Sequence, residues 1–140
     1  MAWAGGYGDL WIANFDHGSM TRLHTATGVS KTLPVPLAGP SWPLVDDDDV
    51  WVADWSGPDV VRLNAIGAPR PHLIRLPVTS FSGVWSLAAG DGYIWATTAR
   101  DGTLWRIDPK TNDVKRIQVP YLPTGVTADA NGIWVTVRGR

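Results

Sequence analysis

A tryptophan-centred motif recurs four times along the chain at an almost constant interval. It reads LWIAN at 10–14, VWVAD at 50–54, IWATT at 94–98 and IWVTV at 133–137, so its tryptophans are 40, 44 and 39 residues apart. Two further motifs lie between these tryptophans in a constant order, one around an arginine and one around a valine, at Arg22, Arg62 and Arg106 and at Val35, Val78 and Val119. Several motifs that recur in one order indicate a repeat architecture.

The repeated segments have the character of short β-strands. They are rich in β-branched and aromatic residues and are bounded by Gly, Pro, Asp or Asn, which favour turns. Glu is absent and Lys occurs only three times, so the composition disfavours helices. Four short strands in about 40–45 residues is the period of a β-propeller blade.

We therefore predict an all-β fold, a β-propeller of four-stranded antiparallel blades, with about 3.5 blades in this chain. The expected repeats form one domain and cover residues 1–36, 37–79 and 80–120, followed by a partial repeat at 121–140. We name the strands of a blade A to D from the propeller axis outward. Because such a count leaves the ring open, we expect either a fragment of a longer propeller or self-association into a homodimer or higher oligomer that completes it.

Two segments carry a family resemblance. Residues 123–135 read PTGVTADANGIWV and residues 102–114 read GTLWRIDPKTNDV, and together they resemble the repeats of YVTN/NHL-type propellers, which include surface-layer and virginiamycin B lyase-like proteins. The resemblance implies the propeller fold, usually with about six or seven blades in a whole ring. It also implies that lyase activity would need a His and a Glu acting with Mg²⁺. This sequence has no Glu, and its histidines do not fall in a matching motif.

Charge and composition argue against several classes of partner. A formal net charge of −1 offers no general basic face, so we expect neither a nucleic acid nor a membrane as partner. The absence of Cys excludes disulfides, cysteine-ligated metals and thiol catalysis. The sequence contains no nucleophile elbow, phosphate loop or dinucleotide fingerprint, so we expect no cofactor and assign no catalytic residue. The compartment stays open.

Two sets of polar residues are candidate metal sites. The Asp run at 46–49 supplies carboxylates of the kind that bind Ca²⁺, but it lacks the spacing of a calcium loop. We therefore interpret it as a solvated turn, with a cation site as the alternative. The histidines at 17, 24 and 72 occupy different positions within their repeats and have no metal-ligand spacing. We accordingly expect no metal.

The repeated Trp and Arg residues are most simply structural. A Trp at the equivalent position of every repeat suits packing between blades, and ligand stacking is the alternative interpretation. For the strand C arginines we expect pairing between blades or a solvated strand face, with recognition of an anion as the alternative.

One loop face is the best candidate for function. In a propeller the B–C and D–A connections emerge on the same face, and rigid scaffolds position such loops for binding. Here these connections are aromatic, whereas the opposite face carries Asp, Gly, Asn and Thr. Exposed aromatic residues on one rim mark an interaction surface, although packing over the channel edge is the alternative. The candidate ligand-face residues are Phe15, His17, Trp42, Trp55, Phe81, Arg100 and Tyr121.

These features favour a non-enzymatic recognition or scaffold module that binds a protein or a glycan on the aromatic loop face. The alternatives are an engineered or natural propeller fragment without a ligand, and a virginiamycin B lyase-like enzyme. Half a ring would also leave a bare sheet face at each end. The apolar candidates for these faces, not all of which can point outward because strand residues alternate, are Leu10, Ile12 and Val35 at the first blade and Ile133, Val135 and Val137 at the last.

Overall fold

The computed structural model describes residues 2–139, which form fourteen β-strands and one short 3₁₀ turn at Phe15–His17. The strands make three four-stranded antiparallel sheets and one two-stranded sheet, each from consecutive strands. This arrangement confirms the predicted all-β propeller with about 3.5 blades.

Blade 1 consists of β1 (Ala2–Gly6), β2 (Asp9–Asn14), β3 (Ser19–His24) and β4 (Ser30–Pro34). Blade 2 consists of β5 (Pro40–Asp46), β6 (Asp49–Asp54), β7 (Asp59–Asn64) and β8 (His72–Arg75). Blade 3 consists of β9 (Val84–Gly90), β10 (Tyr93–Thr98), β11 (Thr103–Ile107) and β12 (Val114–Gln118). The terminal hairpin consists of β13 (Leu122–Asp129) and β14 (Gly132–Arg138).

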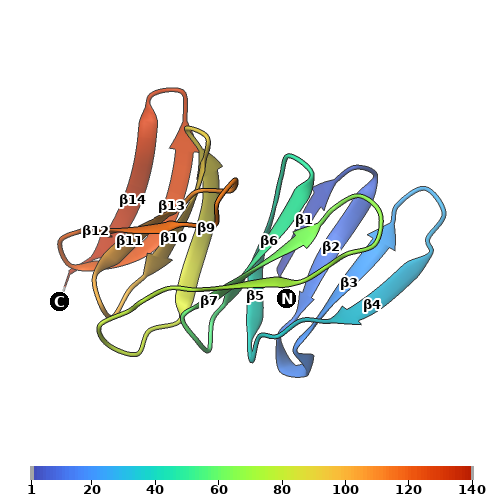
Figure 1. Ribbon diagram of the computed structural model, residues 1–140, viewed down its shortest axis with the longest axis horizontal. Helices are drawn as coiled ribbons and strands as arrows, with labels where there is room; N and C mark the ends of the chain where they lie inside the picture. The colour runs from blue at the N-terminus through green and yellow to red at the C-terminus, as the bar shows by residue number, and fades with distance from the viewer. Residues whose placement is uncertain (1, 140) are drawn as a thin grey trace.

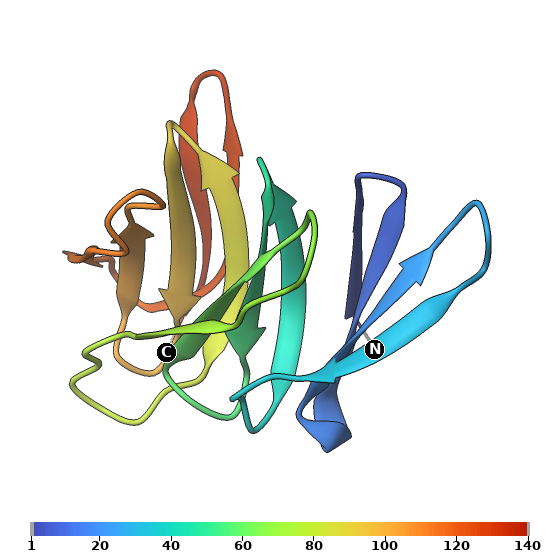
Figure 2. The same cartoon turned by 45° about the vertical axis from the view of Figure 1, so that its right-hand side comes forward.

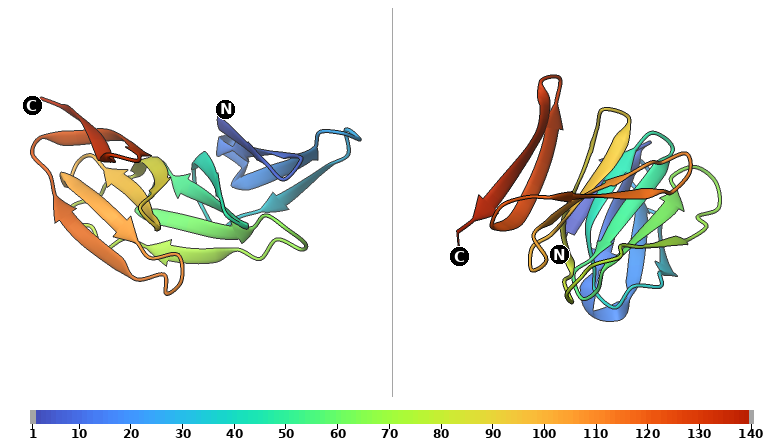
Figure 3. Two further views of the ribbon diagram at one scale, coloured as in Figure 1. Left: turned by 90° about the horizontal axis from the view of Figure 1, so that it is seen from above. Right: turned by 60° about the vertical axis from the view of Figure 1, so that its left-hand side comes forward.

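The sheets follow one another along the long axis of the molecule. Figure 1 shows blade 1 at one end and the terminal hairpin at the other, with blades 2 and 3 between them. Seen from above, the sheets trace an arc (Figure 3, left). The inner strands make the contacts between blades: β5 touches β1 and β2, β9 touches β5 and β6, and β13 touches β9 and β10 (Figure 2). No helix within residues 2–139 is long and apolar enough to cross a membrane.

Strand pairing explains why the tryptophan and arginine motifs repeat together. Trp11 lies opposite Arg22 in the β2–β3 pair, and Trp51 lies opposite Arg62 in the β6–β7 pair. Trp95 lies opposite its arginine in the β10–β11 pair in the same way. Directly opposite residues on neighbouring strands have their side chains on one face of the sheet. Each Trp therefore shares a sheet face with the arginine of its own blade.

The hydrophobic core lies between the blades, and every blade has two different faces. One face carries the repeated Trp and packs against the following sheet; we call it the tryptophan face. The other carries mainly aliphatic residues, together with Trp105 in blade 3, and packs against the preceding sheet; we call it the aliphatic face. The three clusters unite Trp11 with Val50, Val52, Val61 and Leu63, Trp51 with Ile94, Ala96, Trp105 and Ile107, and Trp95 with Val126, Ile133 and Val135. This confirms the predicted packing role for three of the four repeated tryptophans.

The two end faces differ in part from the expectation. Val35 is buried in the cluster between blades 1 and 2, and Ile133 and Val135 pack against the blade 3 cluster. Their prediction as bare end-face residues was wrong: strand alternation turns Ile133 and Val135 toward blade 3, and Val35 lies in the β4–β5 connection, where it packs into the cluster between blades 1 and 2. On β14 the alternation instead leaves Trp134 on the outward face, 57% exposed.

Candidate functional site

A buried carboxylate joins the loops of the predicted ligand face. Asp54, at the end of β6, accepts backbone N–H hydrogen bonds from Ala38 at 3.3 Å, Gly39 at 2.9 Å and Ser56 at 2.9 Å. Two of these donors belong to the connection between blades 1 and 2, and the third belongs to the β6–β7 loop. A carboxylate that accepts several N–H bonds holds loop backbone firmly. It fixes the base of the loop that carries Trp55.

The next connection approaches that loop so closely that only glycine fits. A Cβ atom at Gly83 would collide with the carbonyl of Trp55. The same segment is tied to both neighbouring loops, because the N–H of Val84 donates to the Gly57 carbonyl at 3.3 Å and the N–H of Arg100 donates to the Ser82 hydroxyl at 3.2 Å. Close backbone approach without a side chain is a role that glycine alone can fill.

These contacts create a small pocket between blades 2 and 3, which we call the rim pocket. It has a volume of about 130 Å³ and is lined by Trp55, Phe81, Ser82, Gly83, Trp85 and Arg100. The rings of Trp55 and Trp85 lie with their centroids 4.5 Å apart and their planes tilted by 35°. Phe81 is 67% exposed. The pocket thus offers aromatic faces at the surface with one guanidinium beside them.

The lining of the rim pocket suits binding better than acid–base chemistry. It contains no carboxylate and no imidazole, and its only hydroxyl, that of Ser82, already bonds the Arg100 N–H and the Gly83 carbonyl. Aromatic rings stack on the apolar face of a sugar or on another ring, and a guanidinium supplies directed donors. Within residues 2–139 no three His, Asp or Glu side chains gather as a set of metal ligands.

The structure brings three of the seven predicted ligand-face residues together, namely Trp55, Phe81 and Arg100. The others lie elsewhere. Phe15 and His17 form the exposed 3₁₀ turn of blade 1, and Tyr121 is exposed in the β12–β13 connection.

Trp42 does not lie in a connecting loop, as the sequence analysis placed it. It sits inside β5 at a β-bulge, with a φ of 41°, and its Nε1 donates to the Leu87 carbonyl at 2.9 Å. A bulge adds a residue to one strand and redirects its side chain. The same device accounts for Trp85, which sequence reasoning missed: the register of β9 shifts between Val84 and Ser86. The available signal was an aromatic residue just after a D–A connection, as at Trp42.

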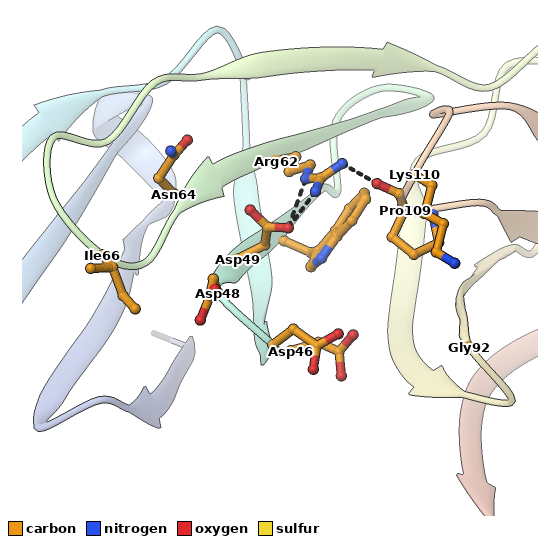
Figure 4. Close-up of a pocket in the computed structure, with 11 residues that line it drawn as sticks. Asp46, Asp48, Asp49, Arg62, Asn64, Ile66, Gly92, Pro109 and Lys110 are labelled. Carbon is orange, nitrogen blue, oxygen red and sulfur yellow. Dashed lines mark hydrogen bonds and ion pairs between the residues drawn. The ribbon is translucent and has the colours of Figure 1, made fainter.

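A larger cavity, of about 630 Å³, lies on the opposite face between blades 2 and 3 (Figure 4). Its main feature is Arg62, whose Nε and Nη2 donate to one carboxylate oxygen of Asp49 at 2.9 and 2.5 Å. Arg62 Nη1 donates to the Pro109 carbonyl and, at 3.2 Å, to Asn112 Oδ1, both in blade 3. The guanidinium carbon lies 5.2 Å from the centre of the Trp51 ring. We call this Asp–Arg–carbonyl arrangement the arginine tie, because it joins two blades.

Blade 1 has the same arginine tie. Arg22 Nε donates to Asp9 at 2.7 Å, Arg22 Nη1 donates to the Gly67 carbonyl of blade 2 at 3.2 Å, and the guanidinium lies 5.2 Å from the Trp11 ring centre. Burial acts to raise the pKa of Asp9, but hydrogen bonds from Arg22 and His24 outweigh it, so the net pKa is lowered. The predicted pairing between blades is confirmed for these two arginines.

Blade 3 departs from the pattern. Tyr93 stands where blades 1 and 2 have the tie's aspartate, and Arg106 lies 4.3 Å from the Tyr93 ring centre.

The run of four Asp residues at 46–49 is partly structural, since Asp49 belongs to the arginine tie of blade 2 while Asp47 and Asp48 are exposed in the turn. Burial, followed by repulsion from Asp47 and Asp49, raises the pKa of Asp46. The cavity therefore reflects an inter-blade joint.

Comparisons with known proteins extend these observations at the level of fold. No family model matches the sequence, and no curated protein is significantly similar to it. The structure is similar to virginiamycin B lyase from Staphylococcus aureus, with a TM-score of 0.85, 20% identity and coverage of 97% of this chain and 48% of the lyase chain. It is also similar to the extracellular domain of a putative one-component system from B. thetaiotaomicron, with a TM-score of 0.77, 19% identity and coverage of 96% of this chain and 20% of that chain.

A third similar structure is the computationally designed Ika4 protein, with a TM-score of 0.74, 18% identity and coverage of 99% of this chain and 90% of that chain. Likeness at these identities shows a shared fold, and it confirms the propeller resemblance read from the repeats. The chain spans about half the length of the lyase.

Proposed function

We propose that this chain is a recognition module that binds a protein or a glycan through the rim pocket. The observation that carries the proposal is the convergence of Trp55, Phe81, Trp85 and Arg100 on one surface pocket. Function follows the site rather than the fold, and this site combines exposed ring faces with a charged donor. Such a combination is typical of surfaces that hold a partner.

The preorganisation of the rim pocket supports the proposal. The Trp55 loop is held by the Asp54 carboxylate, and the Phe81 segment is held by the bonds of Ser82 and Val84. A ligand that binds to fixed rings does not have to order them, so less free energy is lost on association. Ring-to-sugar and ring-to-ring stacking both fit exposed aromatic faces, and the Arg100 guanidinium can orient a hydroxyl or a carbonyl beside them.

We do not propose lyase activity for this chain. The sequence contains no Glu, and the rim pocket has neither a carboxylate nor an imidazole to act as general acid or base. The likeness to the lyase concerns the fold.

The test is a binding screen by saturation-transfer NMR with hexose oligosaccharides and short peptides that contain tyrosine or tryptophan. We expect at least one class to bind, and calorimetry to show an affinity loss of about tenfold or more in Phe81→Ala and in Trp55→Ala. Ile66→Ala is the matched control, because Ile66 is an exposed apolar residue on the opposite face. The proposal fails if neither class binds, or if a binder keeps its affinity in both rim variants.

A further inference from the structure

The three junctions inside the chain follow one rule. At each of them a tryptophan face packs against the aliphatic face of the following sheet. The third junction shows that two strands are enough, because the terminal hairpin leaves Trp95 only 7% exposed. The rule therefore does not depend on a complete blade.

The two ends of the described chain carry the unpaired halves of such a junction. The terminal hairpin presents a tryptophan face, with Trp134 between the exposed Thr127 and Thr136 on the neighbouring positions of β13 and β14. Blade 1 presents an aliphatic face, with Leu10 and Ile12 at the positions that Val50 and Val52 occupy in blade 2.

The aliphatic face of blade 1 continues across its strands. Leu23 lies opposite Leu10 on β3, and the exposed Trp3 lies opposite Ile12 on β1. These side chains are half-buried or exposed, whereas Val50 and Val52 are fully buried. Contiguous apolar surface of this kind marks an interaction site.

We propose that the chain binds a second copy of itself head to tail, the tryptophan face of one terminal hairpin packing on the aliphatic face of the partner's blade 1. The partner surface is of the same kind that covers Trp11, Trp51 and Trp95 within the chain, so the contact continues an interface already present three times. Neither end face carries a full charge at its centre, since Trp134, Leu10 and Ile12 are all apolar.

The arc of the chain favours a closed pair over an open polymer. The two end faces are different surfaces, so the contact is heterologous and closes only if the rotation per chain divides a full turn. Each chain supplies four sheets, so two chains joined in this way form a ring of eight sheets, six full blades and two hairpins, which lies within the four to eight blades typical of closed propellers. Two chains then bring two equivalent junctions together in one ring.

Sedimentation equilibrium of the whole chain tests this proposal. We expect a dimer, and we expect Trp134→Glu and Ile12→Arg each to weaken dimerisation by at least tenfold, because each places a charge in both junctions. Val29→Glu is the control, since Val29 is exposed in the β3–β4 turn away from both end faces. Far-UV circular dichroism and thermal melting establish that each variant is folded.

Mixing the two end-face variants distinguishes a head-to-tail contact from any other. A mixed dimer of Trp134→Glu and Ile12→Arg has one unsubstituted junction and one in which Glu faces Arg, so we expect dimerisation to return. Failure of the mixture to dimerise would mean a contact other than head to tail and would overturn the proposal. A folded monomer at every concentration would also overturn it, and would leave the Trp134 face to a following segment of a longer polypeptide.

Discussion

Trp51 and Trp134 occupy the same position of the same repeat, yet one is completely buried and the other is 57% exposed. Both lie on the second strand of a sheet, on the face that in blades 1 to 3 packs against the following sheet. The difference is the neighbour: blade 3 covers Trp51, and no sheet within residues 2–139 covers Trp134. Burial in this fold is therefore a property of the junction rather than of the residue.

The largest loss of stability is expected for substitution of Trp51. Trp51→Ala should lower the free energy of unfolding by about 3–5 kcal/mol, the usual loss for a buried aromatic side chain. Urea denaturation followed by circular dichroism measures it. A loss below about 1 kcal/mol would mean that Trp51 is not packed in the core between blades 2 and 3.

The next effect concerns the arginine tie. Arg62→Met should destabilise by about 1–2 kcal/mol, because it leaves Asp49 and the Pro109 carbonyl without their donor while solvent screens part of the loss. Arg106→Met is the matched variant in blade 3, where Tyr93 replaces the aspartate, and it should cost less. Equal losses in the same urea titration would show that the carboxylate adds nothing to the tie.

A smaller effect follows from the lowered pKa of Asp9. Its native pKa lies below the unfolded value of about 3.9, so the carboxylate stabilises the fold above that pH and loses this contribution as the pH falls through the native pKa. Asp9→Asn should therefore flatten the loss of stability between about pH 5 and pH 2. The exposed Asp16 supplies the control, as Asp16→Asn should leave the wild-type acid profile in place, measured by thermal melting.

Trp55, on the loop face, should behave differently from Trp51. It is exposed and contacts Trp85 rather than a blade interior, so Trp55→Ala should change the free energy of unfolding by less than about 1 kcal/mol. A loss as large as that of Trp51→Ala would show that the rim pocket is part of the core.

The smallest effect is expected at Trp134 itself. In solution dilute enough to keep the chain monomeric, Trp134→Ala should alter stability by no more than about 0.5 kcal/mol, because the side chain has little to lose. Chemical denaturation at two protein concentrations separates this from association, whose contribution grows with concentration. A large loss that is independent of concentration would contradict the comparison.

The strands could be predicted from the sequence because their signals are local. Alternating apolar residues between turn formers locate β6 and β10, and the constant tryptophan spacing predicts how many sheets form. It was harder to predict which side chains of each strand point into the core. Val135 and Trp134 are neighbours, and only the packing of the hairpin on blade 3 decides which one points inward.

For the candidate site, the sequence predicted only the face of the propeller on which it lies. Trp55, Phe81 and Arg100 come from loops whose side follows from propeller geometry, but their meeting point depends on close backbone contacts such as that at Gly83. The bulges that turn Trp42 and Trp85 have no strong local signal. The arginine tie joins residues about 50 positions apart, such as Arg62 and Asn112. Local sequence patterns do not predict contacts between residues so far apart in the chain.

The building of each blade from consecutive strands has a consequence for synthesis on the ribosome. A blade can pair its own strands as soon as it emerges, because its hydrogen-bonded partners are near in sequence. Its tryptophan face, however, is covered only by the sheet made next. Each completed blade therefore keeps an exposed apolar face until about 40 more residues have been translated, which takes roughly a few seconds at about 5–20 residues per second. Slow translation or ribosome stalling between repeats lengthens that wait, and with it the opportunity for chaperone capture or aggregation.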